Sequence, residues 1–317
     1  MIPAVVKKLI ANKKPAAAKA DAAEPAPRAR RQSAGKHKDW FEIPGEYFGE
    51  NGVIRVLESS DVDLSSLLES FREKTYTKPF VVDDGETRRL HFDLRYVQSA
   101  MTIKQPDELL FAYTQSMMAF LLFAPSPRHV AVVGLGGGSL TRYCYKHLPR
   151  ARITTIEIDE HVIALCEMFD LPPPDRRNVL LRADAVEYFA NTDELADVVL
   201  IDACDAKGVA PAFCKPAFYR TLRERLSPRG VAVINLIGIE DRVELMQRMV
   251  SRAFDGHCLS LKVKGGNQLL FAFNEADFDP DWDGIKRRAE ILESRTQIEF
   301  VSLARRLKRS WKRDVVG

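Results

Sequence analysis

Strand-like and helix-like segments alternate along the chain from His129 onwards, and this alternation constrains the fold more than any other feature. Short apolar runs are separated by segments of helical length at 139–148, 160–169, 184–190 and 216–226; the runs are HVAVVG, RITTIEI, NVLLR, DVVLID and GVAVINLI. Strands that alternate with helices in this way form a parallel sheet with helices on both faces. The sequence therefore predicts an α/β domain.

The end of this domain departs from the alternation. A predicted helix at 240–253 is followed by two strands, HCLSLKV and QLLFAF, which are joined by Gly265-Gly266-Asn267. Such a connection predicts an antiparallel hairpin. Five parallel strands closed by a hairpin fit the Rossmann-like fold of S-adenosylmethionine-dependent transferases better than that of dinucleotide dehydrogenases. We predict this fold for a nucleoside-binding domain at 106–280.

Two further segments flank the α/β domain. Residues 40–105 contain short β-like pieces, and Asp84-Gly85 separates two runs that can pair as a hairpin, so we predict a small β-rich domain there. Pro106 is expected to open a buried helix that extends to Phe123. Residues 281–317 are predicted to be helical, with a basic and solvated end, RRLKRSWKR.

The first 39 residues form a basic tail. They carry ten Lys and Arg against three acidic residues, a net charge of +7, whereas the whole chain carries +3. The tail is rich in Ala, Pro and Lys and shows no hydrophobic period, which predicts disorder. Charge runs of this kind are usually solvated. We therefore do not expect the tail to bind nucleic acid or a membrane.

The cysteines and histidines argue against a disulfide framework or a metal centre. Five cysteines include no C-x-x-C pair, and six histidines show no metal-ligand spacing. We therefore expect no bound metal and a reduced, cytoplasmic setting. No apolar run is long enough to predict a membrane span.

A glycine-rich turn follows the first parallel strand and opens the next helix. It has the sequence GLGGGS and contains Gly134, Gly136, Gly137 and Gly138. Glycine allows a backbone to approach a ligand closely, and α/β sheets bind ligands at such a position, so we expect these glycines to contact a ligand. Glu157 ends the next strand, 23 residues after Gly134, where its carboxylate can accept hydrogen bonds from both hydroxyls of a ribose.

Further acidic residues follow the third and fourth parallel strands. Asp184 and Ala185 come after the third strand, where Asp184 can meet an adenine amino group or cap the helix that begins there. Asp202 and Asp205 follow the fourth strand, at the carboxyl edge where ligands bind. Each acid alone has an ordinary structural explanation. Because acids follow three successive strands, we predict a ligand that contains adenosine.

Residues from about 98 to 238 resemble the spermidine synthase, or polyamine aminopropyltransferase, family, especially its divergent bacterial spermidine-synthase-like branch. The motifs that carry this resemblance are GLGGGSL, TIEIDEHVI, RADAVEYF, VLIDACDAKG and FYRTLRERLSPRGVAVINL. The resemblance implies that Glu157 binds the ribose, that Asp184 and Ala185 bind the adenine, and that Asp202 with Asp205 faces the reacting amine. It also implies that the loop at 203–215 is a gate over the site.

Two positions depart from the family pattern. Typical members have GGGDGG, whose Asp binds the aminopropyl ammonium of decarboxylated S-adenosylmethionine, and Gly137 stands in its place. The family's D-x-x-D-P-x-G-P becomes DACDAKGV at 202–209, without either proline.

These observations leave three functions open. The first is aminopropyl transfer from decarboxylated S-adenosylmethionine to an amine acceptor, with Asp202 taking or relaying the amine proton. The second is methyl transfer from S-adenosylmethionine, favoured by Gly137 because an Asp there would repel the carboxylate of that donor. The third is a catalytically silent nucleoside-binding scaffold, which the retention of Asp202 and Asp205 disfavours. The donor is expected as a co-substrate, with no permanently bound cofactor, and a homodimer is left open.

Overall fold

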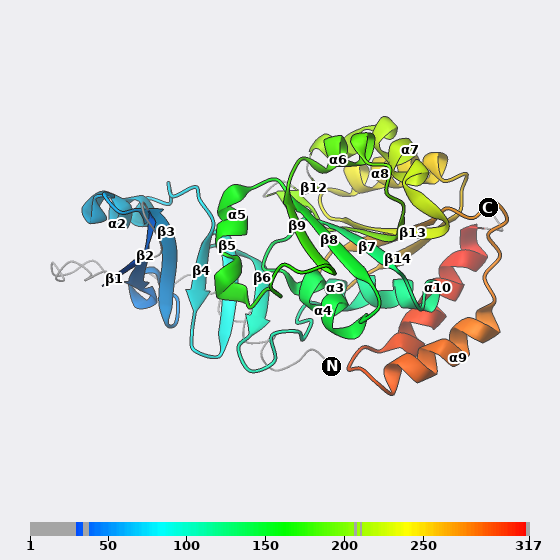
Figure 1. Cartoon of the computed structure of the whole chain (residues 1–317), viewed down its shortest axis with the longest axis horizontal. Helices are drawn as coiled ribbons and strands as arrows, with labels where there is room; N and C mark the ends of the chain where they lie inside the picture. The colour runs from blue at the N-terminus through cyan, green and yellow to red at the C-terminus, as the bar shows by residue number, and fades with distance from the viewer. Residues whose placement is uncertain (1–29, 34–37, 206–207, 210, 315–317) are drawn as a thin grey trace. The chain divides into compact units, whose positions relative to one another are not determined.

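The computed structural model describes residues 30–33, 38–205, 208–209 and 211–314, and it divides into two compact units (Figure 1). The first contains the described residues up to Leu110 together with Gly136–Ser139 and Asp159–Leu171. The second contains the remaining parts of the chain from Phe111 onwards. Part of the glycine-rich turn therefore belongs to the first unit, whereas the sequence assigns the whole turn to the α/β domain.

The first unit is built on an antiparallel sheet whose six strands follow their order in the chain. The strands are β1 (Arg30–Ser33), β2 (Lys38–Pro44), β3 (Val53–Ser59), β4 (Phe80–Asp83), β5 (Thr87–Asp93) and β6 (Tyr96–Thr102). A 3₁₀ turn, η1 (Gly45–Phe48), follows β2, and helix α2 (Leu64–Arg72) follows β3. The buried Leu67 and Phe71 of α2 pack against Phe41, Ile54 and other apolar side chains of the sheet.

The hairpin predicted at Asp84-Gly85 is present between β4 and β5. Gly85 has a φ of 82°, in the left-handed region that glycine adopts without strain. The Asp84 carboxylate accepts hydrogen bonds from the Thr87 backbone N–H at 2.7 Å and the Thr87 hydroxyl at 2.9 Å, which stabilises the turn.

Strand β1 lies within the segment that the sequence assigns to the tail. It pairs antiparallel with β2, with Arg30 opposite Glu42 and Ser33 opposite Asp39. Backbone hydrogen bonds to a neighbouring strand need no hydrophobic period, so the composition of this segment did not indicate it. The sheet therefore begins earlier than the predicted boundary at residue 40.

A helical segment from the α/β part of the sequence packs on the sheet of the first unit. It consists of α5 (Glu160–Ala164) and a 3₁₀ turn, η3 (Cys166–Phe169). Its Leu165 and Phe169 are buried in a cluster with Val81, Leu90 and Met101. The sequence predicts one helix over 160–169, but Leu165 N–H bonds to the carbonyl of Val162, and this tighter turn ends α5.

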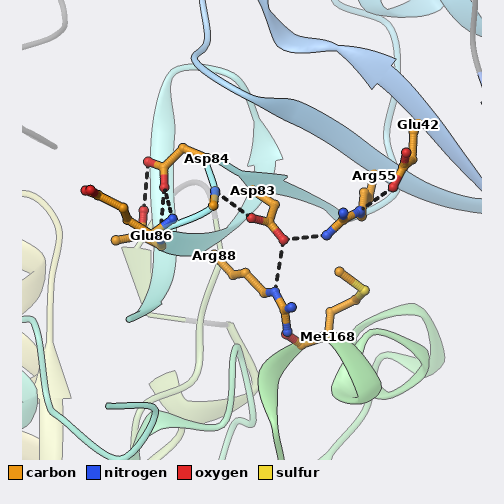
Figure 2. Close-up of polar contacts among 9 residues, drawn as sticks. Glu42, Arg55, Asp83, Asp84, Glu86, Arg88 and Met168 are labelled. Carbon is orange, nitrogen blue, oxygen red and sulfur yellow. Dashed lines mark hydrogen bonds and ion pairs between the residues drawn. The ribbon is translucent and has the colours of Figure 1, made fainter. Parts of the chain in front are cut away.

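An ion-pair cluster joins this segment to the sheet (Figure 2). The Asp83 carboxylate contacts Arg55 and accepts a hydrogen bond from Arg88 Nε at 3.0 Å, while Arg88 Nη1 donates to the Met168 carbonyl at 2.6 Å. Arg55 also pairs with Glu42 at 2.9 Å. Burial raises the pKa of Asp83, but the donors from Gly85 and Arg88 and the two arginine charges outweigh it, so this pKa lies below its ordinary value.

The second unit contains the predicted parallel sheet. Its strand order is β14-β15-β13-β10-β7-β8-β9, and the five strands from β13 to β9 are parallel, whereas β15 is antiparallel to both neighbours. The strands are β7 (His129–Val133), β8 (Arg152–Glu157), β9 (Asn178–Arg182), β10 (Ala196–Ile201), β13 (Leu226–Leu236), β14 (Cys258–Lys262) and β15 (Gln268–Phe273). The prediction of five parallel strands closed by a hairpin is confirmed.

Helices cover both faces of this sheet (Figure 1). One face carries α6 (Ala185–Asn191), α7 (Pro216–Glu224) and α8 (Glu240–Ala253), and the other carries α3 (Ala112–Met117), α4 (Ser139–His147) and α10 (Phe300–Asp314). A short 3₁₀ turn, η2 (Met118–Leu122), follows α3, and another, η4 (Pro211–Cys214), precedes α7. Helix α9 (Trp282–Glu293) precedes α10. No helix in the described part of the chain has both the length and the apolar composition that a membrane crossing requires.

The helix expected to open at Pro106 begins later. The N–H of Glu108 bonds to the carbonyl of Gln105 in a turn, and α3 begins only at Ala112, after Phe111 at its N-cap position. Pro106 is compatible with the first position of a helix, but it is equally compatible with a turn, and the following residues decide between them. The later start places Tyr113 in the first turn of α3.

Candidate active site

The first glycine of the turn is required by the protein's own backbone. Gly134 follows β7 with a φ of 90°, and its N–H donates to the carbonyl of Ile156 at 2.9 Å. A Cβ at this position would lie 2.4 Å from the carbonyl oxygen of Asp202. Any side chain would therefore collide with the backbone that follows β10. At Gly134 the structure thus shows a close approach between two strand ends, and the contact with a ligand that the sequence predicts stays a prediction.

The remaining glycines of the turn belong to the first unit. Gly136 and Gly138 have φ values of 50° and 72°, which glycine adopts with the least strain. Gly137 is buried, and a Cβ there would lie 2.7 Å from Ser99 Oγ and 3.1 Å from two carbons of the Phe169 ring. The hydroxyls of Ser99 and Ser139 are hydrogen-bonded at 3.3 Å. A side chain at position 137 would therefore be crowded by Ser99 and Phe169, both of which would have to shift.

Glu157 ends β8 and contacts the turn directly. Its Oε2 accepts a hydrogen bond from the backbone N–H of Leu135 at 2.8 Å. This bond orients the carboxylate at the carboxyl end of the parallel strands. A carboxylate has about four lone-pair sites, so it can accept further hydrogen bonds from a ligand while this one persists.

Asp184 and Ala185 lie after the neighbouring strand, β9. Asp184 is the N-cap of α6, and its Oδ1 accepts from the backbone N–H of Val186 at 2.7 Å. The structural explanation weighed for Asp184 in the sequence is therefore correct for one of its oxygens. Ala185 is the first residue of α6, and the first N–H groups of an α-helix have no acceptor within the helix.

Asp202 follows β10 and is held by two donors. Its Oδ1 accepts from Asn235 Nδ2 at 2.8 Å, and its Oδ2 accepts from the hydroxyl of Tyr113 at 3.1 Å. Burial raises the pKa of this carboxyl above its ordinary value, and the two hydrogen bonds act in the opposite direction because they favour the ionised form. The result is a carboxylate that is more basic than a solvated one and fixed in orientation.

The sequence did not single out Tyr113 or Asn235. Asn235 is 3% exposed and lies inside the apolar strand β13, where a buried polar residue needs a partner. An asparagine inside an apolar strand could therefore have been singled out from the sequence as a residue with a polar partner. Tyr113 gave no comparable signal, because it is 89 residues from Asp202 in the chain.

Asp205 lies in the short strand β11 (Cys204–Asp205), which pairs with β12 (Gly208–Val209). In the parts of the chain that the structure describes, no cluster of three or more His, Cys, Asp or Glu residues has the geometry of a metal site.

The second unit thus brings Glu157, Asp184 and Asp202 to one edge of its sheet. Glu157 is the last residue of β8, and Asp184 and Asp202 follow β9 and β10. These three strands and β7 form a continuous parallel block. Backbone bonds connect neighbouring strand ends, from Asp202 N–H to Val133 and from Ala183 N–H to Glu157, at 2.9 and 3.0 Å. Ligands of open α/β sheets bind at this carboxyl edge.

Comparisons with known proteins agree with this architecture. Residues 110–275 match the profile described as the spermine/spermidine synthase domain. A polyamine aminopropyltransferase from Neisseria meningitidis is 31% identical over 233 residues, which cover 73% of this chain and 89% of the relative. A solved structure of a probable spermidine synthase from Corynebacterium glutamicum is similar with a TM-score of 0.58 and 19% identity, covering 67% of this chain and 84% of that one. The structure of human methyltransferase-like protein 13, solved with SAH, is similar with a TM-score of 0.53 and 22% identity. The match covers 58% of this chain and 91% of that one.

Proposed function

Because the chain belongs to the spermine/spermidine synthase family, we propose that it transfers an aminopropyl group from decarboxylated S-adenosylmethionine to an amine acceptor of the polyamine class. The observation that carries this proposal is the Asp202 carboxylate, which Tyr113 and Asn235 hold at the carboxyl edge of the parallel sheet.

The proposed reaction is a displacement at the carbon that is bonded to the donor's sulfonium. The acceptor nitrogen forms the new N–C bond, the C–S bond breaks, and its electron pair leaves with methylthioadenosine as a neutral thioether. The acceptor must be a neutral amine to attack, although free alkylamines have a pKa near ~10.4. Asp202 accepts or relays the proton, and its burial makes it a stronger base for this purpose. Alignment of nitrogen, carbon and sulfur supplies the rest of the catalysis.

The same edge offers groups for the donor nucleoside. We assign the ribose hydroxyls to Glu157, whose carboxylate the Leu135 N–H already orients. We assign the adenine to Asp184 and the Ala185 N–H, and a backbone contact with the donor to Gly134. The ligand contacts that the sequence predicts at Gly136, Gly137 and Gly138 stay a prediction. Asp205 is assigned to the acceptor amine on the family resemblance.

The experiment is a product analysis. The purified chain is supplied with decarboxylated S-adenosylmethionine or S-adenosylmethionine and a panel of diamines and polyamines, and nucleoside products are separated by chromatography. Release of methylthioadenosine together with a lengthened amine supports the proposal. Failure to form either product with any pair, while methylthioadenosine still binds, contradicts it and supports the silent scaffold.

A second function is favoured by one observation, the crowding at Gly137. Residue 137 is a glycine that Ser99 and Phe169 crowd, so the chain lacks the aspartate with which typical family members hold the aminopropyl ammonium. An intact S-adenosylmethionine, whose own carboxylate would be repelled by such a residue, meets no repulsion here. Release of S-adenosylhomocysteine in the same product analysis identifies methyl transfer.

A further inference from the structure

We propose that Asn267, on the turn between β14 and β15, is a positioning residue that orients the amide of Asn235 so that its NH₂ group faces Asp202. The inference deepens the proposed function, because it assigns an origin to the orientation of the base on which that function rests. It stands on two contacts in the structure: Asn267 Nδ2 donates to Asn235 Oδ1 at 2.9 Å, and Asn235 Nδ2 donates to Asp202 Oδ1 at 2.8 Å.

The register of the sheet explains why these three residues meet. Ile201 of β10 is aligned with Ile234 of β13, so the next residues, Asp202 and Asn235, are neighbours across the two parallel strands. On the other side of β13, Asn235 is aligned with Leu269 of β15. Asn267 lies two residues before Leu269, and such a diagonal neighbour is on the same face of the sheet and within reach of its side chain.

The turn that carries Asn267 is well defined. The backbone carbonyl of Asn267 accepts a hydrogen bond from the N–H of Val263 at 2.7 Å, and this bond closes the turn. Gly265 and Gly266 have φ values of 110° and 95°, in the region that favours glycine. These contacts hold the Asn267 backbone next to the end of β13, so the side chain can act as a fixed donor.

The direction of the two hydrogen bonds, from Asn267 to Asn235 and from Asn235 to Asp202, makes Asn267 a positioning residue. An asparagine side chain has a donor end and an acceptor end of nearly equal shape. An ionised Asp202 needs the donor end of Asn235, which leaves the acceptor end of Asn235 to be satisfied. Asn267 supplies that donor, so its NH₂ group selects the orientation of Asn235 that stabilises the ionised carboxylate. Without it, the Asn235 amide can turn and present its oxygen to Asp202, an arrangement that favours the protonated acid.

The test follows the ionisation of Asp202 directly. The chain is labelled with ¹³C at the aspartate carboxyl carbons, the Asp202 signal is assigned by its absence in Asp202→Asn, and the signal is titrated with pH. In Asn267→Leu, which keeps the approximate shape and removes both hydrogen-bonding ends, the pKa of Asp202 is expected to rise by about 0.5 to 1 unit. In Asn267→Asp it is expected to rise further, because an acceptor then faces Asn235 Oδ1 and the added negative charge acts in the same direction.

Enzyme kinetics supply a second readout. The acidic limb of the kcat profile should move to higher pH by the same amount as the titration, while the KM of the donor changes by less than about twofold, because the donor contacts lie at Glu157 and Asp184. A merely structural role for the turn would change stability without moving the pH profile.

The matched control is Gln268→Leu, the same exchange of amide for leucine on the next residue, whose side chain donates to Ser260 at 2.8 Å. It should leave the Asp202 titration unchanged. The inference is overturned if Asn267→Leu titrates like the wild type or like Gln268→Leu. Should the wild type prove inactive with every donor and acceptor, the proposed function fails, whereas the ¹³C titration still decides the role of Asn267.

Discussion

Gly137→Ala is expected to destabilise the first unit, and the structure allows the size of the effect to be worked out. The new Cβ would lie 2.7 Å from Ser99 Oγ and 3.1 Å from two carbons of the Phe169 ring. Phe169 is 1% exposed and packed among Val81, Leu90 and Met101, so its ring has little room to move. Forcing an extra methyl into such a core costs about 1 to 3 kcal/mol.

An opposing effect has to be subtracted. Gly137 is not among the glycines with positive φ, so alanine can adopt its backbone conformation. Alanine also lowers the conformational entropy of the unfolded chain, which stabilises the folded protein by about 0.4 to 1 kcal/mol. We therefore expect a net loss of about 1.3 kcal/mol, the middle of a range from about 0 to 2.6 kcal/mol. Each kcal/mol lost lowers the melting temperature by about 2 to 4 °C.

The assay is thermal and urea denaturation of wild type, Gly137→Ala, Ser99→Ala and the double variant. Removing Ser99 Oγ relieves the shortest contact but leaves the two contacts with Phe169, so the double variant should recover only part of the loss, with a coupling of about 0.5 to 1 kcal/mol. If Gly137→Ala is as stable as the wild type and the coupling is zero, the crowding argument is refuted, and with it the reason given for the missing aspartate.

Three further outcomes are expected. Asp202→Asn should lower turnover by about 10² to 10⁴ while calorimetry shows unchanged binding of methylthioadenosine, since the base is lost but the nucleoside contacts remain; equal turnover would remove Asp202 from the proton transfer. Glu157→Ala should weaken methylthioadenosine binding by about 1.5 to 3 kcal/mol, the contribution of hydrogen bonds to a charged group, and an unchanged affinity would contradict its assignment to the ribose. The folded pKa of Asp83 lies below its unfolded value of about 3.9, so its stabilisation is present above that pH and is lost as pH falls through the folded pKa. Urea denaturation between about pH 6 and 3 should therefore show a steeper loss of stability for wild type than for Asp83→Asn, and parallel curves would show that the ion-pair cluster contributes nothing.

The candidate site could be predicted from the sequence only as far as single strand ends. Glu157, Asp184 and Asp202 were found because each lies at or just after the end of a predicted strand, and the carboxyl ends of parallel strands meet at one edge. Their partners were not predicted. The donors to Asp202 come from residues 89 and 33 positions away, and the Leu135 N–H that orients Glu157 is 22 positions away.

The glycine-rich turn illustrates the same limit. Its composition correctly indicated close approaches, but not which atoms of the chain make them. The contact with a ligand stays a prediction. In the structure the backbone of Asp202 lies against Gly134, and Ser99 and Phe169 lie against Gly137. A glycine in the sequence indicates that another group lies close to the backbone, and only the tertiary structure shows which group that is.

The sequence by itself determined the alternation of strands and helices in the second unit, the terminal hairpin and the positions of the acids along the chain, because these follow from hydrophobic periodicity and from turn residues that act locally. The order of the strands in the sheet came from the tertiary structure. Only the tertiary structure decided that α5 and η3 pack on the first sheet, that β1 extends it, and that Asn267 and Tyr113 join the network around Asp202. These contacts depend on which surfaces meet when distant segments are packed. No local pattern of residues predicts these contacts, because the free energy that stabilises them arises from packing between distant segments and not within any one segment.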